Sequence, residues 1–183
     1  MGENASHFVL LDRDGVINVD RPGSVLSREA FELLPGAAEA IAELNRKGYR
    51  VLVITNQACV GRGELEPLEL ESIHALMLDK VRQAGGHIDD IYVCPHSDED
   101  GCDCRKPKPG LINRARSDHD FDPAVTWFIG DTARDIGAAR NAGCRPGLVT
   151  SVQDGAKGLD ADLPVFDDLQ HFARELEAKR DFS

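Results

Sequence analysis

Short apolar runs alternate with longer amphipathic segments along the whole chain. The runs at 8–11 (FVLL) and 49–54 (YRVLVI) end in polar or turn-forming residues, which is typical of strands buried on both faces of a parallel sheet. Similar runs predict strands at 88–93, at 125–129, near 147–149 and near Val165. Apolar positions at helical spacing predict helices at 36–47, 67–84, 110–117, 133–142 and 169–179. This alternation indicates an α/β fold, a Rossmann-like parallel sheet with helices on both faces, because parallel neighbours need right-handed crossovers.

Length and charge limit the domain organisation and the partners. The 183 residues are expected to form a single domain over 1–183 without a large cap domain, since a domain of this size already buries about 70% of its unfolded surface. The chain carries 32 acidic against 21 basic residues, a net charge of −11, which disfavours nucleic acids and anionic membranes as partners. No secretion signal is recognisable at the N-terminus, and no apolar surface stripe is evident, so we expect a cytoplasmic monomer.

Two aspartates follow the first predicted strand, in the sequence DRDG. In extended chain, Asp12 and Asp14 point to one side and Arg13 points to the other. Two close carboxylates repel each other unless a cation lies between them or their tasks differ. With a divalent cation, one carboxylate can attack a phosphorus atom while the other transfers protons. An isolated motif of this kind is more typical of a turn, so its meaning depends on the ends of the other strands.

Those other strand ends carry groups that suit a phosphate. Thr55 and Asn56 end the second predicted strand and offer a hydroxyl and backbone N–H groups. Lys106 offers a cation just before a helix, and Asp131 and Asp135 span the end of a later strand and the first turn of the following helix. Ligands of parallel α/β sheets bind beyond the carboxyl ends of the strands, so these groups are expected at one site. Each of them taken alone has an ordinary structural explanation, as a turn, a surface lysine or a helix cap.

In this order along the chain, the four groups resemble the motifs of the haloacid dehalogenase superfamily, and the resemblance to its phosphatases extends from end to end. It implies hydrolysis of a small-molecule phosphate ester through an aspartyl-phosphate intermediate. Asp12 is then the nucleophile, and Asp14 is the acid and base that serves the leaving group and the water. Thr55 and Lys106 hold the transferring phosphoryl group.

The same resemblance implies a Mg²⁺ cofactor. Its ligands are the Asp12 carboxylate, the backbone carbonyl of Asp14 and Asp131, while Asp135 supports this set from one helical turn further on. Charge on the equatorial oxygens of the phosphoryl group would be stabilised by the cation and by Lys106.

A second group of ligands lies in the polar segment at about 94–109. Three thiols and one imidazole, a complete set for tetrahedral zinc, are provided by Cys94, His96, Cys102 and Cys104. The alternative is a loop with reduced surface cysteines, and the spacing differs from that of common zinc fingers. A structural Zn²⁺ would stiffen the loop that delivers Arg105 and Lys106, and would offset the ordering cost of a segment with few apolar residues.

The zinc loop followed by CRKP resembles one branch of the superfamily, which contains D-glycero-D-manno-heptose 1,7-bisphosphate 7-phosphatases and histidinol-phosphate phosphatases. The segment LLDRDGVINVD, and TNQ at 55–57 followed by VGRG at 60–63, resemble the heptose side of that branch. Asn56, Arg62 and Arg105 are then substrate-binding residues, the arginines as anchors for a second phosphate. Two alternatives stay open, namely a histidinol-phosphate phosphatase and a catalytically inactive phosphate-binding module.

Overall fold

A computed structural model describes residues 7–150 and 160–178 of the chain. Its centre is a six-stranded sheet in which every paired strand is parallel, in the order β3-β2-β1-β4-β5-β6. The strands are β1 (His7–Leu11), β2 (Tyr49–Asn56), β3 (Asp90–Cys94), β4 (Trp127–Gly130), β5 (Arg145–Val149) and β6 (Val165–Phe166). The α/β prediction of a parallel sheet is confirmed, and β1 occupies the interior of the sheet between β2 and β4.

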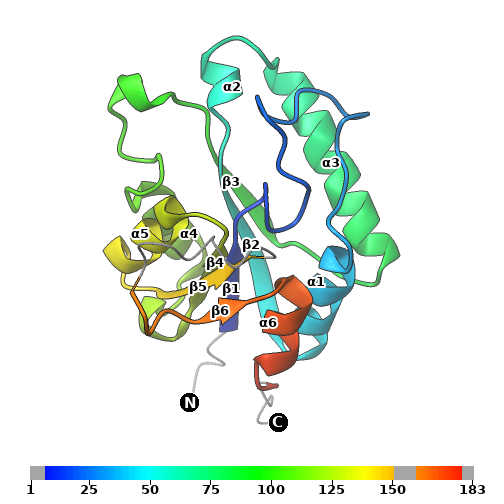
Figure 1. The fold of residues 1–183 in the computed structure, drawn as a ribbon, viewed down its shortest axis with the longest axis vertical. Coiled ribbons are helices and arrows are strands. Elements are labelled where there is room, and N and C mark those ends of the chain that lie inside the picture. Colours follow the sequence, from blue (N-terminus) through cyan, green and yellow to red (C-terminus); the bar gives the residue numbers. More distant parts are fainter. Residues whose placement is uncertain (1–6, 151–159, 179–183) are drawn as a thin grey trace.

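Helices cover both faces of this sheet (Figure 1). One face carries α1 (Ala37–Arg46), α3 (Pro67–Gln83) and α6 (Leu169–Glu175), and the other carries α4 (Gly110–His119) and α5 (Ala133–Asn141). Along β1, Val9 and Leu11 pack into the first layer, whereas Phe8 and Leu10 pack into the second. Because both layers exclude water, β1 is apolar at consecutive positions.

Three local features differ from the sequence prediction. A short helix, α2 (Ala58–Gly61), was not predicted; it forms where the Gly61 N–H donates to the carbonyl oxygen of Pro95 at 2.9 Å, a partner from a distant segment. The strand predicted at 125–129 starts later, because Pro123–Val125 forms a 3₁₀ turn. The last helix ends at Glu175, where Lys47 Nζ donates to the carbonyl oxygens of Ala173 and Leu176; position 179 of its predicted range lies outside the described residues.

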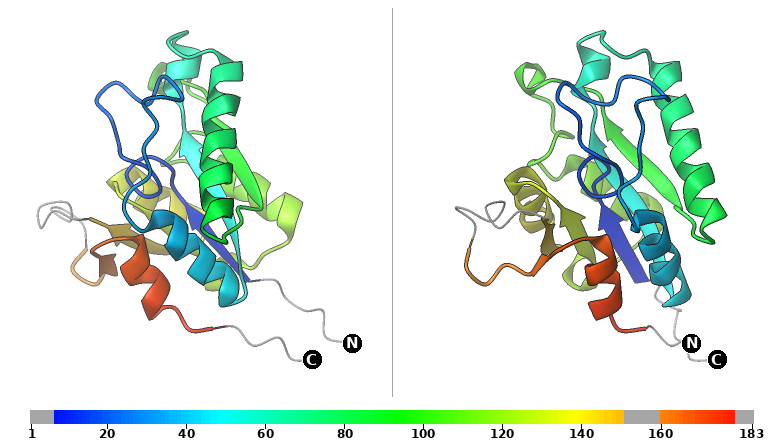
Figure 2. Two further views of the ribbon diagram at one scale, coloured as in Figure 1. Left: turned by 90° about the vertical axis from the view of Figure 1, so that its right-hand side faces the viewer. Right: turned by 45° about the vertical axis from the view of Figure 1, so that its right-hand side comes forward.

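The loops beyond the carboxyl ends of the strands gather at one edge of the sheet. The connection from β1 to α1 rises beside α3 (Figure 2), and the Arg28 N–H donates to Glu69 Oε1 at 2.9 Å. The same edge carries α2 and the 3₁₀ helix η1 (Asp98–Asp100) of the segment 94–109. Among the described residues, no helix combines the length and the apolar character needed to cross a lipid bilayer.

Candidate active site

Asp12 lies at the point where β1 leaves the sheet. Its backbone N–H still donates to the carbonyl oxygen of Ile129 in β4, at 2.9 Å. Its side chain is buried, and Oδ1 accepts from the Arg13 backbone N–H at 2.7 Å and lies 2.7 Å from Lys106 Nζ. Both neighbours engage the same oxygen of the carboxylate, so the two oxygens of Asp12 have different surroundings.

Asp14 lines the same cavity as Asp12, as the sequence predicts. Its carboxylate accepts from the Arg13 guanidinium at 3.0 Å, from the Asn18 amide at 2.9 Å and from the Gln57 amide at 2.7 Å. Burial alone would raise the pKa of Asp14, but the Arg13 charge and these hydrogen bonds hold it below its ordinary value. The carboxylate is therefore ionised at neutral pH and held in one orientation.

Arg13 is a buried partner of Asp14, and the prediction that it points away from the aspartates is wrong. The chain turns after Asp12, with Gly15 at φ 80°, and the alternation expected of extended chain ends there. The Arg13 side chain is fully buried and its Nη1 lies 3.1 Å from Nε2 of His74 on α3. Burial and the Arg13 charge lower the pKa of His74 to about 4, so a neutral ring faces the guanidinium.

Lys106 contacts three segments, the residue after β1, the interior of β2 and the first turn of α5. Its Nζ lies 2.7 Å from Asp12 Oδ1 and 2.6 Å from Asp135 Oδ1, and it donates to the carbonyl oxygen of Ile54 at 3.0 Å. The side chain is only 3% exposed. Burial would lower the pKa of this ammonium group, but the two carboxylates raise it above its ordinary value. Lys106 is thus a fixed, permanently charged cation beside Asp12.

Asn56 and Thr55 have side-chain partners that the sequence does not reveal. The Asn56 amide makes two hydrogen bonds to the backbone of Lys106, accepting from its N–H at 3.1 Å and donating to its carbonyl at 3.2 Å. It also lines the cavity. The hydroxyl of Thr55 is buried and accepts from the Gln57 amide at 2.8 Å. Asn56 therefore attaches the end of β2 to the loop that carries Lys106.

Three carboxylates form a group with the geometry of a cation site. Oxygens of Asp12, Asp131 and Asp135 all lie within 4.8 Å of one another. Burial and the charge of Asp135 raise the pKa of Asp131 to about 7, and burial raises the pKa of Asp12 despite the nearby Lys106. One ammonium group does not neutralise three clustered carboxylates. A hard divalent cation such as Mg²⁺, which prefers oxygen ligands, fits this donor set.

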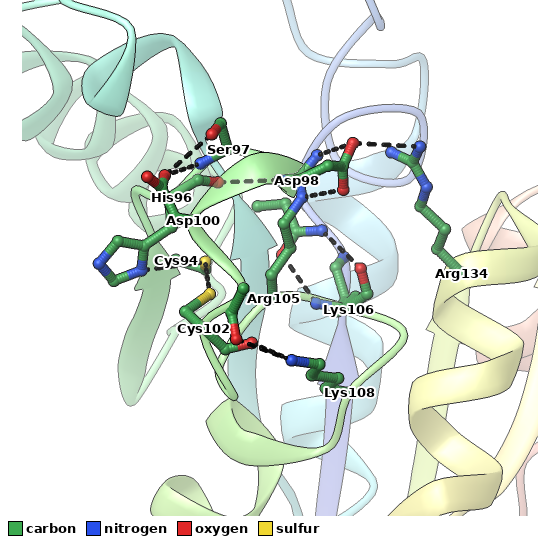
Figure 3. Close-up of polar contacts among 12 residues, drawn as sticks. Cys94, His96, Ser97, Asp98, Asp100, Cys102, Arg105, Lys106, Lys108 and Arg134 are labelled. Atoms are coloured by element: carbon green, nitrogen blue, oxygen red, sulfur yellow. Dashed lines mark hydrogen bonds and ion pairs between the residues drawn. The ribbon is translucent and has the colours of Figure 1, made fainter.

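The four predicted zinc ligands also come together. The sulfur atoms of Cys94, Cys102 and Cys104 lie 3.3 to 3.7 Å from one another, and His96 Nδ1 lies 3.2 Å from Cys104 Sγ and 3.7 Å from Cys94 Sγ. A zinc tetrahedron with Zn–S bonds of about 2.3 Å has S···S edges of about 3.8 Å. The set therefore has nearly the dimensions of a closed structural site. Figure 3 shows three of its members, Cys94, His96 and Cys102, beside the loop that leads to Lys106.

The arginines predicted to bind substrate do not reach the wall of this cavity, which has a volume of about 170 Å³. Arg62 is exposed and pairs with Glu64 at 2.7 Å. Arg105 pairs with Asp98 at 2.6 Å and donates to the carbonyl oxygen of His96 at 3.2 Å. Arg134, which the sequence analysis did not single out, lines the cavity instead. The sequence did contain a signal for Arg134. It directly precedes Asp135, a predicted site residue, and both lie in the first turn of α5, which borders the site.

Comparisons with known proteins agree with this geometry. Residues 3–143 match the family model described as haloacid dehalogenase-like hydrolase. The chain is 40% identical over 173 residues to the D-glycero-beta-D-manno-heptose-1,7-bisphosphate 7-phosphatase of Pseudomonas aeruginosa, covering 92% of this chain and 97% of the relative. It is 37% identical over 179 residues to the D-glycero-alpha-D-manno-heptose-1,7-bisphosphate 7-phosphatase of Mycobacterium bovis, with 94% of both chains covered.

A solved structure extends the similarity to three dimensions. The D,D-heptose 1,7-bisphosphate phosphatase from B. bronchiseptica, complexed with magnesium and phosphate, superposes with a TM-score of 0.87 at 38% identity. The alignment covers 92% of this chain and 97% of that one. The similarity thus includes nearly the whole fold as well as the strand ends that carry the candidate site.

Proposed function

The chain belongs to the haloacid dehalogenase-like hydrolases, and from that membership we propose that it is a magnesium-dependent phosphatase that removes the 7-phosphate of D-glycero-D-manno-heptose 1,7-bisphosphate. The observation that carries the proposal is the Asp12 carboxylate, held by Lys106 at 2.7 Å and grouped with two further carboxylates at the cavity. The substrate follows from the relatives described above, which share more than nine-tenths of the chain with this protein.

In the first chemical step, a carboxylate oxygen of Asp12 forms a bond to the phosphorus atom and the bond from phosphorus to the sugar oxygen breaks. Asp14 gives a proton to that leaving oxygen; since the free carboxylate is ionised, it first takes up this proton from solvent when the negatively charged phosphate of the substrate binds beside it and favours the protonated form. The hydrogen bonds from Arg13, Asn18 and Gln57 keep Asp14 oriented toward the cavity. Lys106 lies against Asp12 and stabilises negative charge on the phosphoryl oxygens.

In the second step, Asp14 removes a proton from water, the water oxygen attacks phosphorus, and the bond to Asp12 breaks to release phosphate. Mg²⁺, when bound, neutralises charge on the transferring phosphoryl group. The carboxylates of Asp12 and Asp131 and the backbone carbonyl of Asp14 would hold it, with Asp135 supporting them. The backbone N–H groups near Thr55 and Asn56 would contact phosphate oxygens in both steps.

Gly15→Ala is expected to raise the Mg²⁺ concentration needed for half-maximal activity by about tenfold. A Cβ atom at Gly15 would lie 2.0 Å from Asp131 Oδ2, so the carboxylate would have to move. Gly85→Ala is the matched control, because Gly85 has nearly the same φ, 84°, but nothing within 4 Å of its Cβ position. Activity titrated with Mg²⁺ separates the two variants. Equal Mg²⁺ requirements would show that Asp131 tolerates the displacement.

The substrate is tested by phosphate release, with Mg²⁺ present, from both anomers of heptose 1,7-bisphosphate, from histidinol phosphate and from simple sugar monophosphates. A preference for one heptose bisphosphate of about a hundredfold in kcat/KM, equivalent to about 2.7 kcal/mol, is expected. A preference for histidinol phosphate would leave the reaction unchanged and reject the proposed substrate. Phosphate binding without release from any ester would instead identify an inactive binding module.

The remaining features of the proposal concern the organisation of the protein. We infer one catalytic domain over 1–183 with a zinc loop at about 94–109, acting as a monomer in the cytoplasm. The grouping of three thiols with one imidazole, in a chain with an odd number of cysteines, favours metal ligation over disulfides and suits a reducing compartment. Size-exclusion chromatography with light scattering tests the monomer, and limited proteolysis tests the single domain.

A further inference from the structure

Two arginines from different parts of the chain contact one carboxylate beside the catalytic cavity (Figure 3). Asp98, in η1, pairs with Arg105 Nε at 2.6 Å through Oδ1 and with Arg134 Nη2 at 3.7 Å through Oδ2. Arg105 belongs to the segment 94–109, whereas Arg134 lies in the first turn of α5. The two guanidinium groups differ in how many of their N–H donors are available to bind a ligand.

The guanidinium of Arg105 donates its hydrogen bonds to residues of its own loop. Its Nε and Nη2 donate to the two oxygens of Asp98, its Nη1 donates to the carbonyl oxygen of His96, and its side chain is 12% exposed. It lines a neighbouring cavity with Lys108 rather than the cavity of Asp12. The hydrogen bonds of this guanidinium therefore stay within the segment 94–109.

Arg134 combines exposure with a position on the catalytic cavity. It lines that cavity and its side chain is 57% exposed. Among the described residues, Asp98 is its only ion-pair partner, at 3.7 Å, and the Asp98 side chain is itself 67% exposed. An exposed ion pair of this kind contributes little to stability, so an incoming anion can replace it at small cost. Most of the guanidinium donors remain available.

In a wall dominated by carboxylates, one exposed cation marks the point where an anion can bind. Its wall carries five aspartates, Asp12, Asp14, Asp20, Asp131 and Asp135, against two cations, Lys106 and Arg134. Lys106 is buried with Asp12 and Asp135, so Arg134 is the cation available at the mouth among the residues that line this wall. The cavity, about 170 Å³, is smaller than the roughly 300–1,000 Å³ of pockets that enclose a drug-sized ligand. This volume suits the reacting phosphate and its neighbouring atoms, so we place the rest of a sugar bisphosphate at the rim.

We propose that Arg134 binds the second, non-reacting phosphate of the substrate at the mouth of the cavity. The proposal rests on the proposed function, since it requires a bisphosphate. A guanidinium group matches two phosphate oxygens with two parallel hydrogen bonds, which a lysine cannot do. Asp98 holds that guanidinium beside the mouth in the absence of the phosphate. Arg134 is thus a specificity-determining residue that contributes to binding and not to the chemical step.

The test compares heptose 1,7-bisphosphate with heptose 7-phosphate, which lacks the second phosphate. Arg134→Gln is expected to raise KM for the bisphosphate by about tenfold or more, to leave its kcat within about twofold, and to leave KM for the monophosphate unchanged. Arg134→Lys should bind the bisphosphate more tightly than Arg134→Gln but less tightly than the wild type, because lysine has the positive charge of arginine but lacks its two parallel N–H donors. Arg140→Gln is the matched control, since Arg140 lies on the same helix but pairs with Asp160 and does not line the cavity.

Three results would overturn the inference. If Arg105→Gln raises KM for the bisphosphate and Arg134→Gln does not, the second phosphate binds to Arg105. Equal changes with both substrates would make Arg134 a structural link between α5 and the segment 94–109. An unchanged KM in both variants would remove both arginines from substrate recognition. A wild-type enzyme without preference for the bisphosphate would reject the proposed substrate itself, which this comparison detects before any variant is measured.

Discussion

Asp12→Asn is expected to reduce phosphate release by at least about 10⁴-fold, with substrate binding largely retained. The amide is a poor nucleophile, so the aspartyl phosphate cannot form. Lys106 and the carboxylates of Asp131 and Asp135 remain in place to hold the phosphoryl group and the cation. Single-turnover phosphate release and calorimetric titration with inorganic phosphate separate the loss of chemistry from a loss of binding.

The Asp12→Asn protein is also expected to remain folded. The substitution removes one negative charge from three clustered carboxylates, and burial already disfavours the ionised form of Asp12. Its Tm should therefore equal or exceed that of the wild type. Asp79→Asn, on the exposed face of α3, is the matched control and should leave activity unchanged. More than about one hundredth of wild-type activity in a folded Asp12→Asn protein would assign the nucleophile to another residue.

Loss of zinc is expected to have the second-largest effect. Cys102→Ser should reduce the zinc content from one atom per chain to near zero, lower the Tm, and decrease kcat by about a hundredfold. Lys106 follows Cys104 by two positions, so we expect a zinc ion bound to this set to fix the loop that places the ammonium group beside Asp12. Structural zinc binds small domains with about 10–16 kcal/mol, and a polar loop has little apolar burial to replace that free energy.

Metal analysis, thermal unfolding and phosphate release on one preparation test this expectation. Cys144→Ala is the matched control, because Cys144 is buried between other elements and outside the zinc set. It should keep its zinc and its kcat while losing some stability, since a buried side chain is shortened. If a chelator removes zinc and the folded protein retains full activity, zinc does not position Lys106.

Several features of this protein follow from the sequence by itself. Consecutive apolar residues in β1 and β2 predict strands covered on both faces, and the alternation with helical segments predicts a parallel sheet. Asp12, Asp14 and Asp131 follow predicted strands directly, so the common edge of a parallel sheet brings them together, as observed. The zinc set is equally local, because its four ligands lie within residues 94–104. These features depend on the spacing of apolar residues along short segments and on the parallel direction of the strands, and both can be predicted from the sequence.

Other features were decided by the tertiary structure. The guanidinium of Arg13 contacts Asp14 because the chain turns at Gly15 and α3 supplies His74. Asn56 binds the backbone of Lys106, fifty positions away in the chain. Arg105 and Arg134 both contact Asp98, yet of these two only Arg134 lines the cavity of Asp12. Long polar side chains take their direction from hydrogen-bond and charge partners in distant segments, and those partners become neighbours only when the sheet and the loops at its edge have assembled.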